Sequence, residues 1–349
     1  MESRFGMVNW RVDERPLVVI WEATRACQLA CRHCRASAQR RPLPGELDTL
    51  AARELIGQVR ALNPPIFVIT GGDPLERADL WSLLADARAA GLRTFLAPSA
   101  TPRLTTESLA AAEAVGCAGV QLSLDGATAQ THDRFRGIAG TFERTVAAAG
   151  WVRGRGLALS VATTVTRDNA DELPSIAQQV AAMGAGMWSV FFLVPTGRGR
   201  KEQAVDPERA DQILRWLVDA SRTLPFRVKT TEAPQIRRLV AGDMAERPTA
   251  GIGDGRGFAF IAYNGDVWPS GFLPVAAGNV RDRSLAEIYR DSPLFRQLRD
   301  PDALRGPRCG RCPHRALCGG SRSRAYAYSG DPLGDDPLCA YVPAGGEVR

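Results

Sequence analysis

The sequence predicts an α/β protein built around an open or partial barrel of six βα units, followed by a smaller module. Over most of the first 200 residues, short apolar runs rich in valine, isoleucine and phenylalanine alternate with amphipathic stretches rich in alanine, leucine and arginine. Such alternation is typical of parallel strands joined by covering helices. The 349 residues, 45% of them apolar and 23% charged, suffice for one large core and a smaller appended one.

Six strands are expected, and each precedes a helix. The strands are predicted at residues 17–22, 66–70, 93–97, 119–124, 158–165 and 188–194, and the helices at 49–62, 79–90, 105–115, 141–153, 171–183 and 207–221. Asp206 before Pro207 is a typical helix start, because Asp caps the first turn and Pro fits within it. Parallel sheets of this kind place functional groups at the carboxyl ends of their strands.

The second module is expected to begin at residue 223, where glycine- and proline-rich segments replace the βα pattern. This divides the chain into residues 1–222 and 223–349. Apolar segments at 258–262 and 267–269 flank Asn264-Gly265, which is a strong hairpin signal. A helix near 284–290 then leads into a cysteine-rich loop.

Composition limits the possible partners and locations. The net charge of +6 comes almost entirely from arginine, because Lys201 and Lys229 are the only lysines. A basic balance could favour a carboxylate-bearing small molecule, whereas no basic run with interleaved aromatics indicates nucleic acid. No apolar run approaches a membrane span and the first 16 residues lack the apolar core of a signal peptide, so we expect a cytoplasmic protein with no membrane partner.

Eight cysteines in such a chain favour metal or redox chemistry over disulfides. Cys27, Cys31 and Cys34 form a C-x3-C-x2-C loop directly after the first predicted strand. Three thiolates can bind three irons of a [4Fe–4S] cubane and leave the fourth iron open to a ligand from outside the protein. Zinc bound by the three cysteines and His33 fits less well, because His33 adjoins Cys34 and neighbouring residues chelate one metal poorly.

The second cysteine set reads C-x2-C-x5-C followed by a distant cysteine. Its members are Cys309, Cys312, Cys318 and Cys339. Four thiolates complete one iron–sulfur cluster, and on spacing alone a tetrahedral zinc site is an equal alternative. Cys117 stands apart and is expected to be a small buried apolar residue without a function.

The first cysteine loop resembles the signature of the radical S-adenosylmethionine (SAM) superfamily. The segment Gly71-Gly72-Asp73-Pro74, after the second predicted strand, looks like the family's glycine-rich motif that contacts the methionine of the cofactor, with Asp where Glu is commoner. Alone, the segment would indicate only a tight turn. The resemblance implies further cofactor contacts at Ser123, Asp125, Thr164 and Pro195.

The same resemblance implies a cofactor, a reaction type and a partner. A [4Fe–4S] cluster on the three cysteines would bind S-adenosyl-L-methionine at its open iron. Reductive cleavage would then give a 5′-deoxyadenosyl radical that abstracts a hydrogen from the substrate. The electron would come from an external donor such as flavodoxin or ferredoxin. The sequence identifies no catalytic acid or base.

The second cysteine loop resembles the SPASM or twitch extension of this superfamily, which holds auxiliary [4Fe–4S] clusters. A complete SPASM domain holds two, but here Ser270 and Arg322 stand where further cysteines would be. The resemblance therefore implies a single auxiliary cluster on Cys309, Cys312, Cys318 and Cys339. Because four cysteines close the site to substrate, electron transfer is its expected role.

Three functions remain open. Residues 318–331 resemble the tail of the alternative heme-pathway enzymes, which remove or decarboxylate propionate side chains, so a tetrapyrrole or other carboxylated small molecule is expected. A ribosomally made peptide is the second candidate; about 16 residues before the first strand are too few for a leader-binding domain, so a separate partner would be needed. The third is a non-catalytic iron–sulfur or zinc scaffold, which would not require the cofactor-facing segments.

Overall fold

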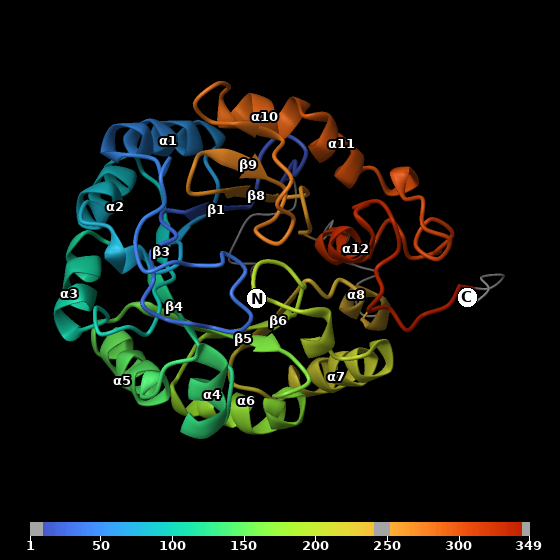
Figure 1. Ribbon diagram of the computed structural model, residues 1–349, viewed down its shortest axis with the longest axis horizontal. Coiled ribbons are helices and arrows are strands. Elements are labelled where there is room, and N and C mark those ends of the chain that lie inside the picture. The colour runs from blue at the N-terminus through green and yellow to red at the C-terminus, as the bar shows by residue number, and fades with distance from the viewer. Residues whose placement is uncertain (1–9, 241–251, 344–349) are drawn as a thin grey trace.

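The computed structural model describes residues 10–240 and 252–343, and one sheet of ten strands organises them. The strand order is β10-β9-β8-β1-β2-β3-β4-β5-β6-β7. The eight strands in the series β8-β1-β2-β3-β4-β5-β6-β7 run parallel to one another, whereas β9 pairs antiparallel with both β8 and β10. Figure 1 shows helices arranged in an arc around these strands, with the C-terminal part of the chain at the open side. The sheet does not close, so the predicted partial barrel is confirmed.

The six predicted strands are all present in the predicted order. They are β1 (Val18–Glu22), β2 (Ile66–Thr70), β3 (Thr94–Leu96), β4 (Gly119–Ser123), β5 (Ala158–Val165) and β6 (Met187–Phe192). A seventh parallel strand, β7 (Arg227–Thr231), pairs with β6 and was not predicted. Its sequence, RVKTT, has one apolar residue, so no apolar run marks it as a strand.

The helices that connect these strands follow the predicted pattern with one addition. They are α1 (Thr49–Leu62), α2 (Leu80–Ala89), α3 (Thr106–Ala114), α5 (Thr141–Gly154), α6 (Leu173–Ala182) and α7 (Pro207–Ala220). Asp206 caps α7 as expected, because its side chain accepts a hydrogen bond from Arg209 N. The addition is α4 (Ala129–Arg136), a short helix between β4 and α5.

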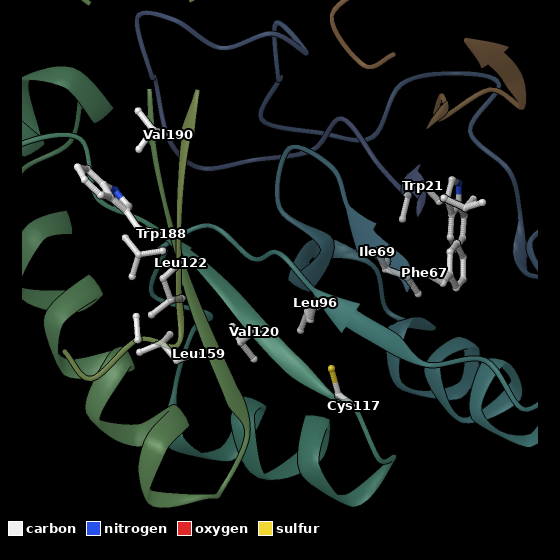
Figure 2. Packing of buried hydrophobic residues seen from close by; sticks show 14 of the residues in the cluster. Trp21, Phe67, Ile69, Leu96, Cys117, Val120, Leu122, Leu159, Trp188 and Val190 are labelled. Atoms are coloured by element: carbon white, nitrogen blue, oxygen red, sulfur yellow. The ribbon is translucent and has the colours of Figure 1, made fainter. Parts of the chain in front are cut away.

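The two faces of the sheet differ in burial. In β5, Leu159, Val161 and Val165 are buried in the core cluster between sheet and helices, whereas the alternate residues Ser160 and Thr164 are partly exposed. The other strands contribute large apolar side chains to the same core (Figure 2). Successive residues of a strand point to opposite faces, so the residues out of phase with the core define an inner face that is accessible to solvent.

The C-terminal part joins the same sheet. β8 (Phe258–Ile261) and β9 (Asp266–Trp268) form the predicted hairpin around Asn264-Gly265, and β8 also pairs in parallel with β1. β10 (Gly278–Asn279) completes this edge. The helical elements of this part are α8 (Ile236–Leu239), α10 (Leu285–Asp291), α11 (Pro293–Arg299) and α12 (Arg322–Ser329). The sheet thus runs across the boundary proposed at residue 223, and the division into two domains stays a prediction.

Within the described residues, the helices are too short or too polar to cross a lipid bilayer.

Candidate cofactor site

Cys27, the first residue of the cysteine loop, lies five residues beyond Glu22, the last residue of β1. Cys27 and Cys31 are buried and Cys34 is partly exposed. Each sulfur accepts one N–H hydrogen bond: Cys27 from Leu29 N at 3.3 Å, Cys31 from Arg136 Nη1 at 3.8 Å and Cys34 from Ala38 N at 3.4 Å. Donors aimed at sulfur stabilise thiolates, and thiolates are the ligands that iron–sulfur clusters require.

These thiols suit a cluster better than a single ion. In the described part of the chain, no three His, Cys, Asp or Glu side chains converge as one metal ion would need. A cubane binds each thiolate to a different iron, so its ligands need not converge on one atom. His33, the fourth ligand of the zinc alternative, packs its ring against Phe135 with centroids 4.3 Å apart, and burial lowers its pKa.

The glycine-rich segment lies directly against the cysteine loop. Gly72 N donates to Thr24 O at 2.7 Å, and Asp73 N donates to Ala26 O at 2.7 Å. A Cβ at Gly71 would lie 2.5 Å from Thr24 O, so the close approach of the two backbones excludes a side chain there. The glycines therefore hold the cysteine loop in place, a role independent of any contact with the cofactor. Pro74 follows as the first residue of a 3-10 turn that Asp73 caps.

The Asp73 side chain faces the protein interior. Its carboxylate accepts hydrogen bonds from Thr101 Oγ1 at 2.7 Å and Ser99 N at 3.3 Å. Burial raises the pKa of Asp73 to about 6 against these hydrogen bonds. Ser99 Oγ donates to Gly72 O at 2.8 Å and lies 3.7 Å from Cys27 Sγ. Asp73 thus positions the β3 loop that flanks Cys27.

A chain of contacts through Arg136 links Asp125 and Thr164 to Cys31. Arg136 was not among the predicted site residues. Asp125 is fully buried and accepts from Thr164 N at 2.6 Å. Its other carboxylate oxygen forms an ion pair with Arg136 at the end of α4. Arg136 donates to Cys31 Sγ, so one chain of contacts links β5, the end of β4 and the cluster loop. Burial raises the pKa of Asp125, whereas Arg136 opposes that effect.

The loop after β6 clamps the cysteine loop from the other side. Arg198 N donates to Cys34 O at 2.9 Å, and its guanidinium donates to Cys31 O at 2.8 Å and Ala38 O at 3.0 Å. Gly197 has a φ of 59°, and a Cβ there would clash with Cys34 O and Arg35 O, so only glycine fits. Pro195 lies in this loop, next to the clamp.

Ser123, at the carboxyl end of β4, borders a small cavity between the cluster loop and α4 and α5. Its lining residues are Leu29, Ser99, Ala100, Ser123, His132, Arg136, Thr141 and Thr145. Leu29 belongs to the cysteine loop and Arg136 contacts Cys31. The cavity therefore places Ser123 on the same side of the sheet as the cysteines.

The second cysteine set lies near the surface. Cys309, Cys312, Cys318 and Cys339 are all partly exposed. Cys309 Sγ accepts from Arg322 Nη2 at 3.8 Å and Cys318 Sγ from Gly320 N at 3.4 Å. Burial by neighbouring protein atoms raises the pKa of Cys318 to about 12. Arg322 stands where a complete SPASM domain would have a further cysteine, and here it donates a hydrogen bond to the sulfur of Cys309.

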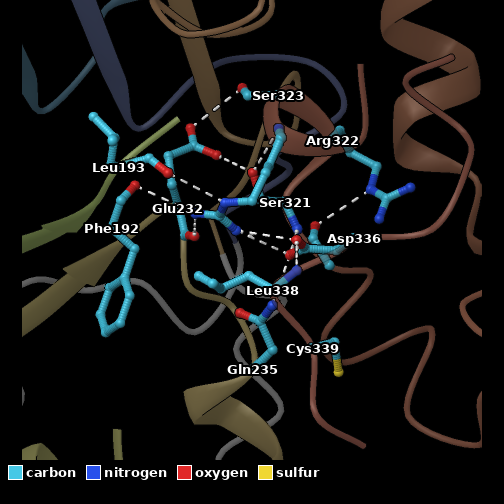
Figure 3. Close-up of polar contacts among 12 residues, drawn as sticks. Phe192, Leu193, Glu232, Gln235, Ser321, Arg322, Ser323, Asp336, Leu338 and Cys339 are labelled. Atoms are coloured by element: carbon cyan, nitrogen blue, oxygen red, sulfur yellow. Dashed lines mark hydrogen bonds and ion pairs between the residues drawn. The ribbon is translucent and has the colours of Figure 1, made fainter. Parts of the chain in front are cut away.

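A buried polar network connects this set to the barrel (Figure 3). Arg324 on α12 donates to the backbone carbonyls of Phe192 at 3.3 Å and Glu232 at 2.6 Å, at the ends of β6 and β7. Asp336 accepts from Arg324 Nη1 at 3.1 Å and from Ser321 N at 2.8 Å. Ser270, the other position without a cysteine, donates to the Glu232 carboxylate at 3.2 Å. The network fixes the second set relative to the strand ends.

Comparison with known proteins gives the class. The model of the radical SAM superfamily matches residues 21–180, and that of an iron–sulfur cluster-binding domain, SPASM, matches residues 254–313. The chain belongs to the radical SAM superfamily. The protein is therefore an enzyme. The two matched domains imply three cofactors, which are a [4Fe–4S] cluster, an auxiliary cluster and S-adenosyl-L-methionine.

Individual relatives narrow the comparison. The chain is 38% identical to the AdoMet-dependent heme synthase of Nitratidesulfovibrio vulgaris, over 93% of this chain and 92% of that protein. It is 33% identical to mycofactocin maturase MftC of Mycobacterium ulcerans, over 93% and 88% of the two chains. The fold matches Streptococcus suis SuiB bound to S-adenosylmethionine with a TM-score of 0.75, at 16% identity, over 94% and 78% of the chains.

Proposed function

We propose that the chain is a radical SAM enzyme that modifies the carboxylate side chains of a tetrapyrrole. The observation that carries the proposal is the 38% identity to an AdoMet-dependent heme synthase along nearly the whole of both chains. The resemblance of residues 318–331 to heme-pathway enzymes supports the same substrate class. The surplus of arginine is compatible with a substrate that carries several negative charges.

The site residues are assigned on the geometry around the cysteines. Cys27, Cys31 and Cys34 would hold the cluster that binds S-adenosyl-L-methionine, and the four cysteines of the second set would hold the auxiliary cluster. When bound, the cofactor supplies a carbon-centred radical for hydrogen abstraction. Contacts to the cofactor are assigned to the following residues of the surrounding loops: Gly71, Gly72, Asp73, Pro74, Ser123, Asp125, Thr164 and Pro195.

The chain's own residues orient and insulate this site. Arg136 and the backbone donors at the sulfurs offset negative charge on the thiolates, and Arg198 holds the carbonyls of the cysteine loop. The core behind the sheet closes the site from the outer side, which leaves the inner face as the route for substrate. The electron that starts the reaction is assigned to an external donor such as flavodoxin or ferredoxin.

Loss of the carboxylate of a propionate side chain as carbon dioxide would require a second redox site. Abstraction of one hydrogen atom from the methylene attached to the ring, followed by release of the carboxylate of the next methylene as carbon dioxide, leaves a vinyl group and one electron. That electron needs an acceptor. The second cysteine set is the group of residues suited to hold one, because the buried Arg324 and Asp336 fix it to the strand ends.

The test is anaerobic turnover of the reconstituted enzyme with S-adenosyl-L-methionine, a reductant and iron coproporphyrin III, a porphyrin with four propionates. Mass spectrometry of the porphyrin and quantitation of 5′-deoxyadenosine are the readouts. Loss of carboxyl groups in step with deoxyadenosine formation supports the proposal. If 5′-deoxyadenosine forms but every carboxylated porphyrin that is tested stays unchanged, the proposed tetrapyrrole substrate class is contradicted.

Maturation of a ribosomally made peptide is the second candidate. The similarity to mycofactocin maturase along 93% of this chain favours it. The two functions differ in whether turnover depends on a peptide precursor. Substrate-dependent deoxyadenosine formation with a precursor peptide, and none with porphyrins, would replace the first proposal with this one.

A further inference from the structure

Lys229 lies on the inner face of the sheet. It is the central residue of β7, and its neighbour Val228 packs against the core on the opposite face. The strand register pairs Lys229 with Ser189 of β6, which lies between the core residues Trp188 and Val190. Because side chains alternate along a strand, Ser189 and Lys229 both point away from the helices.

The register also places Lys229 level with the cofactor site. Ser123 of β4 pairs with Ala162 of β5, Ala162 with Ser189, and Ser189 with Lys229. One row across four strands therefore connects the cavity at Ser123 with the lysine. With strands about 4.8 Å apart, three steps span about 14 Å. That separation leaves room for a substrate beside the cofactor.

Lys229 has many protein atoms around it, yet its side chain remains accessible to solvent. Surrounding protein atoms lower the pKa of its ammonium, and no nearby charge contributes to the shift. The side chain is nevertheless exposed to solvent. Among residues 10–240 and 252–343, no carboxylate forms an ion pair with it and no acceptor hydrogen bonds to its Nζ. An accessible ammonium without a counter-ion in the described residues is available to pair with a ligand that supplies the negative charge.

Aromatic side chains lie next to Lys229 on the same face. Phe191 of β6 pairs with Thr231, two residues after Lys229, so its Cα lies about 8 Å from that of the lysine by strand geometry. Phe191 is partly exposed and contacts Phe272, with ring centroids 6.1 Å apart. A flat aromatic ring with a carboxylate arm could pack on this pair while the arm reaches the ammonium.

We propose that Lys229 binds a carboxylate of the substrate, whose ring packs over Phe191 and Phe272. This inference rests on the proposed function and identifies the residue that would recognise the anionic arm. Lys229 is thus a substrate-binding residue rather than an acid or base of the reaction.

The first test measures the affinity of the reconstituted enzyme for coproporphyrin III by fluorescence titration. Lys229→Met is expected to weaken binding about tenfold or more, because a hydrogen bond to a charged group is lost. Lys229→Arg should bind more tightly than Lys229→Met. Lys201→Met is the matched control, since Lys201 lies outside the sheet and contacts Tyr328, and it should bind like wild type. The tetra-amide of the porphyrin should bind wild type and Lys229→Met alike.

The second test needs no variant. With only two lysines in the chain, acetylation by an amine-reactive ester can be followed at each by mass spectrometry. Coproporphyrin III is expected to protect Lys229 and leave Lys201 reactive, whereas the tetra-amide should protect neither. Equal acetylation of Lys229 with and without bound porphyrin would overturn the inference.

The outcomes separate this inference from the proposed function. If wild type and Lys229→Met bind coproporphyrin III equally, Lys229 is not the anchor and the tetrapyrrole substrate stands. If Lys229→Met instead weakens S-adenosyl-L-methionine alone, the lysine serves the cofactor and the inference is wrong. If wild type binds no porphyrin carboxylate, the proposed function and the inference fall together.

Discussion

Arg324 and Asp336 form an ion pair from which solvent is completely excluded, with Nη1 of the arginine 3.1 Å from Oδ1 of the aspartate. The same arginine donates to carbonyls at the ends of β6 and β7. The aspartate lies three residues before Cys339, whose amide nitrogen donates to Asp336 O at 3.2 Å. The pair therefore connects the barrel to the loop that completes the second cysteine set.

Loss of this pair should destabilise the whole protein. Arg324→Met leaves the Asp336 carboxylate buried without a counter-ion, and the free energy of unfolding should fall by about 3–5 kcal/mol. Urea unfolding followed by circular dichroism measures the change. Arg305→Met is the control, because its ion pair with Asp331 is exposed and contributes about 0–1 kcal/mol. Equal losses in the two variants would show that the buried pair has no special role.

The two cysteine sets should lose iron independently. Cys31→Ala is expected to remove about four irons per chain and abolish cleavage of S-adenosyl-L-methionine, because a three-cysteine site cannot spare a ligand. Cys318→Ala should remove a similar amount of iron while low-temperature EPR still detects the first cluster. Cys117→Ala is the control, since Cys117 is buried in the core cluster away from both sets. Iron loss in Cys117→Ala, or none in Cys318→Ala, would contradict the assignment.

Arg136 should set the reduction potential of the first cluster. Its Nη1 donates to Cys31 Sγ, and hydrogen bonds to cluster sulfurs raise the potential. EPR-monitored redox titration of Arg136→Lys should therefore give a lower midpoint potential at unchanged iron content, because lysine keeps the charge beside Asp125 but not the guanidinium geometry. Arg134→Lys on the exposed side of α4 is the control. A potential equal to that of wild type in Arg136→Lys would refute this role.

Stability should fall as pH rises through neutrality, in part because of Glu232. Burial and the neighbouring Asp254 raise the pKa of Glu232 to about 8, from an ordinary value of 4.5, while Arg324 and Ser321 oppose the shift. The folded state therefore binds this proton more tightly than the unfolded state, and the advantage is lost between about pH 4.5 and about 8.

Thermal unfolding at pH 5 and pH 8 tests the contribution of Glu232. Glu232→Gln keeps the shape and cannot titrate, so its melting temperature should differ less between the two pH values than that of wild type. Glu54→Gln, an exposed change on α1, should behave like wild type. An undiminished pH effect in Glu232→Gln would assign the dependence to other groups.

The sequence predicted those helices, strands and turns that leave a pattern in a short stretch of neighbouring residues. The six parallel strands and their helices follow apolar runs and amphipathic periods, and Asn264-Gly265 marked the hairpin of β8 and β9. β7 escaped because an edge strand with one accessible face needs few apolar residues. α4 was not predicted because its sequence, AQTHDRFR, is almost entirely polar. Its buried residues are Thr131, His132 and Phe135. The parallel pairing of β8 with β1 depends on contacts about 240 residues apart and has no local signal.

The site residues also divide into those with a local sequence signal and those that only the fold brings to the site. The cysteines were identifiable because cluster ligands have fixed spacing in the sequence, and the glycine-rich loop because it has a recognisable order. Arg136 and Arg198 contact Cys31 from segments more than 100 residues away, so these contacts depend on the fold and have no local signal. Lys229 stood out in the sequence as one of two lysines, yet its inner-face position depends on β7, a strand that the sequence did not indicate.

The most direct test of the account is anaerobic reconstitution with iron and sulfide, followed by S-adenosyl-L-methionine and a reductant. The account predicts about eight irons per chain, corresponding to two cubanes, and formation of 5′-deoxyadenosine. Tightly bound zinc, with no cleavage of S-adenosyl-L-methionine under reducing conditions, would contradict it and indicate a metal-stabilised scaffold.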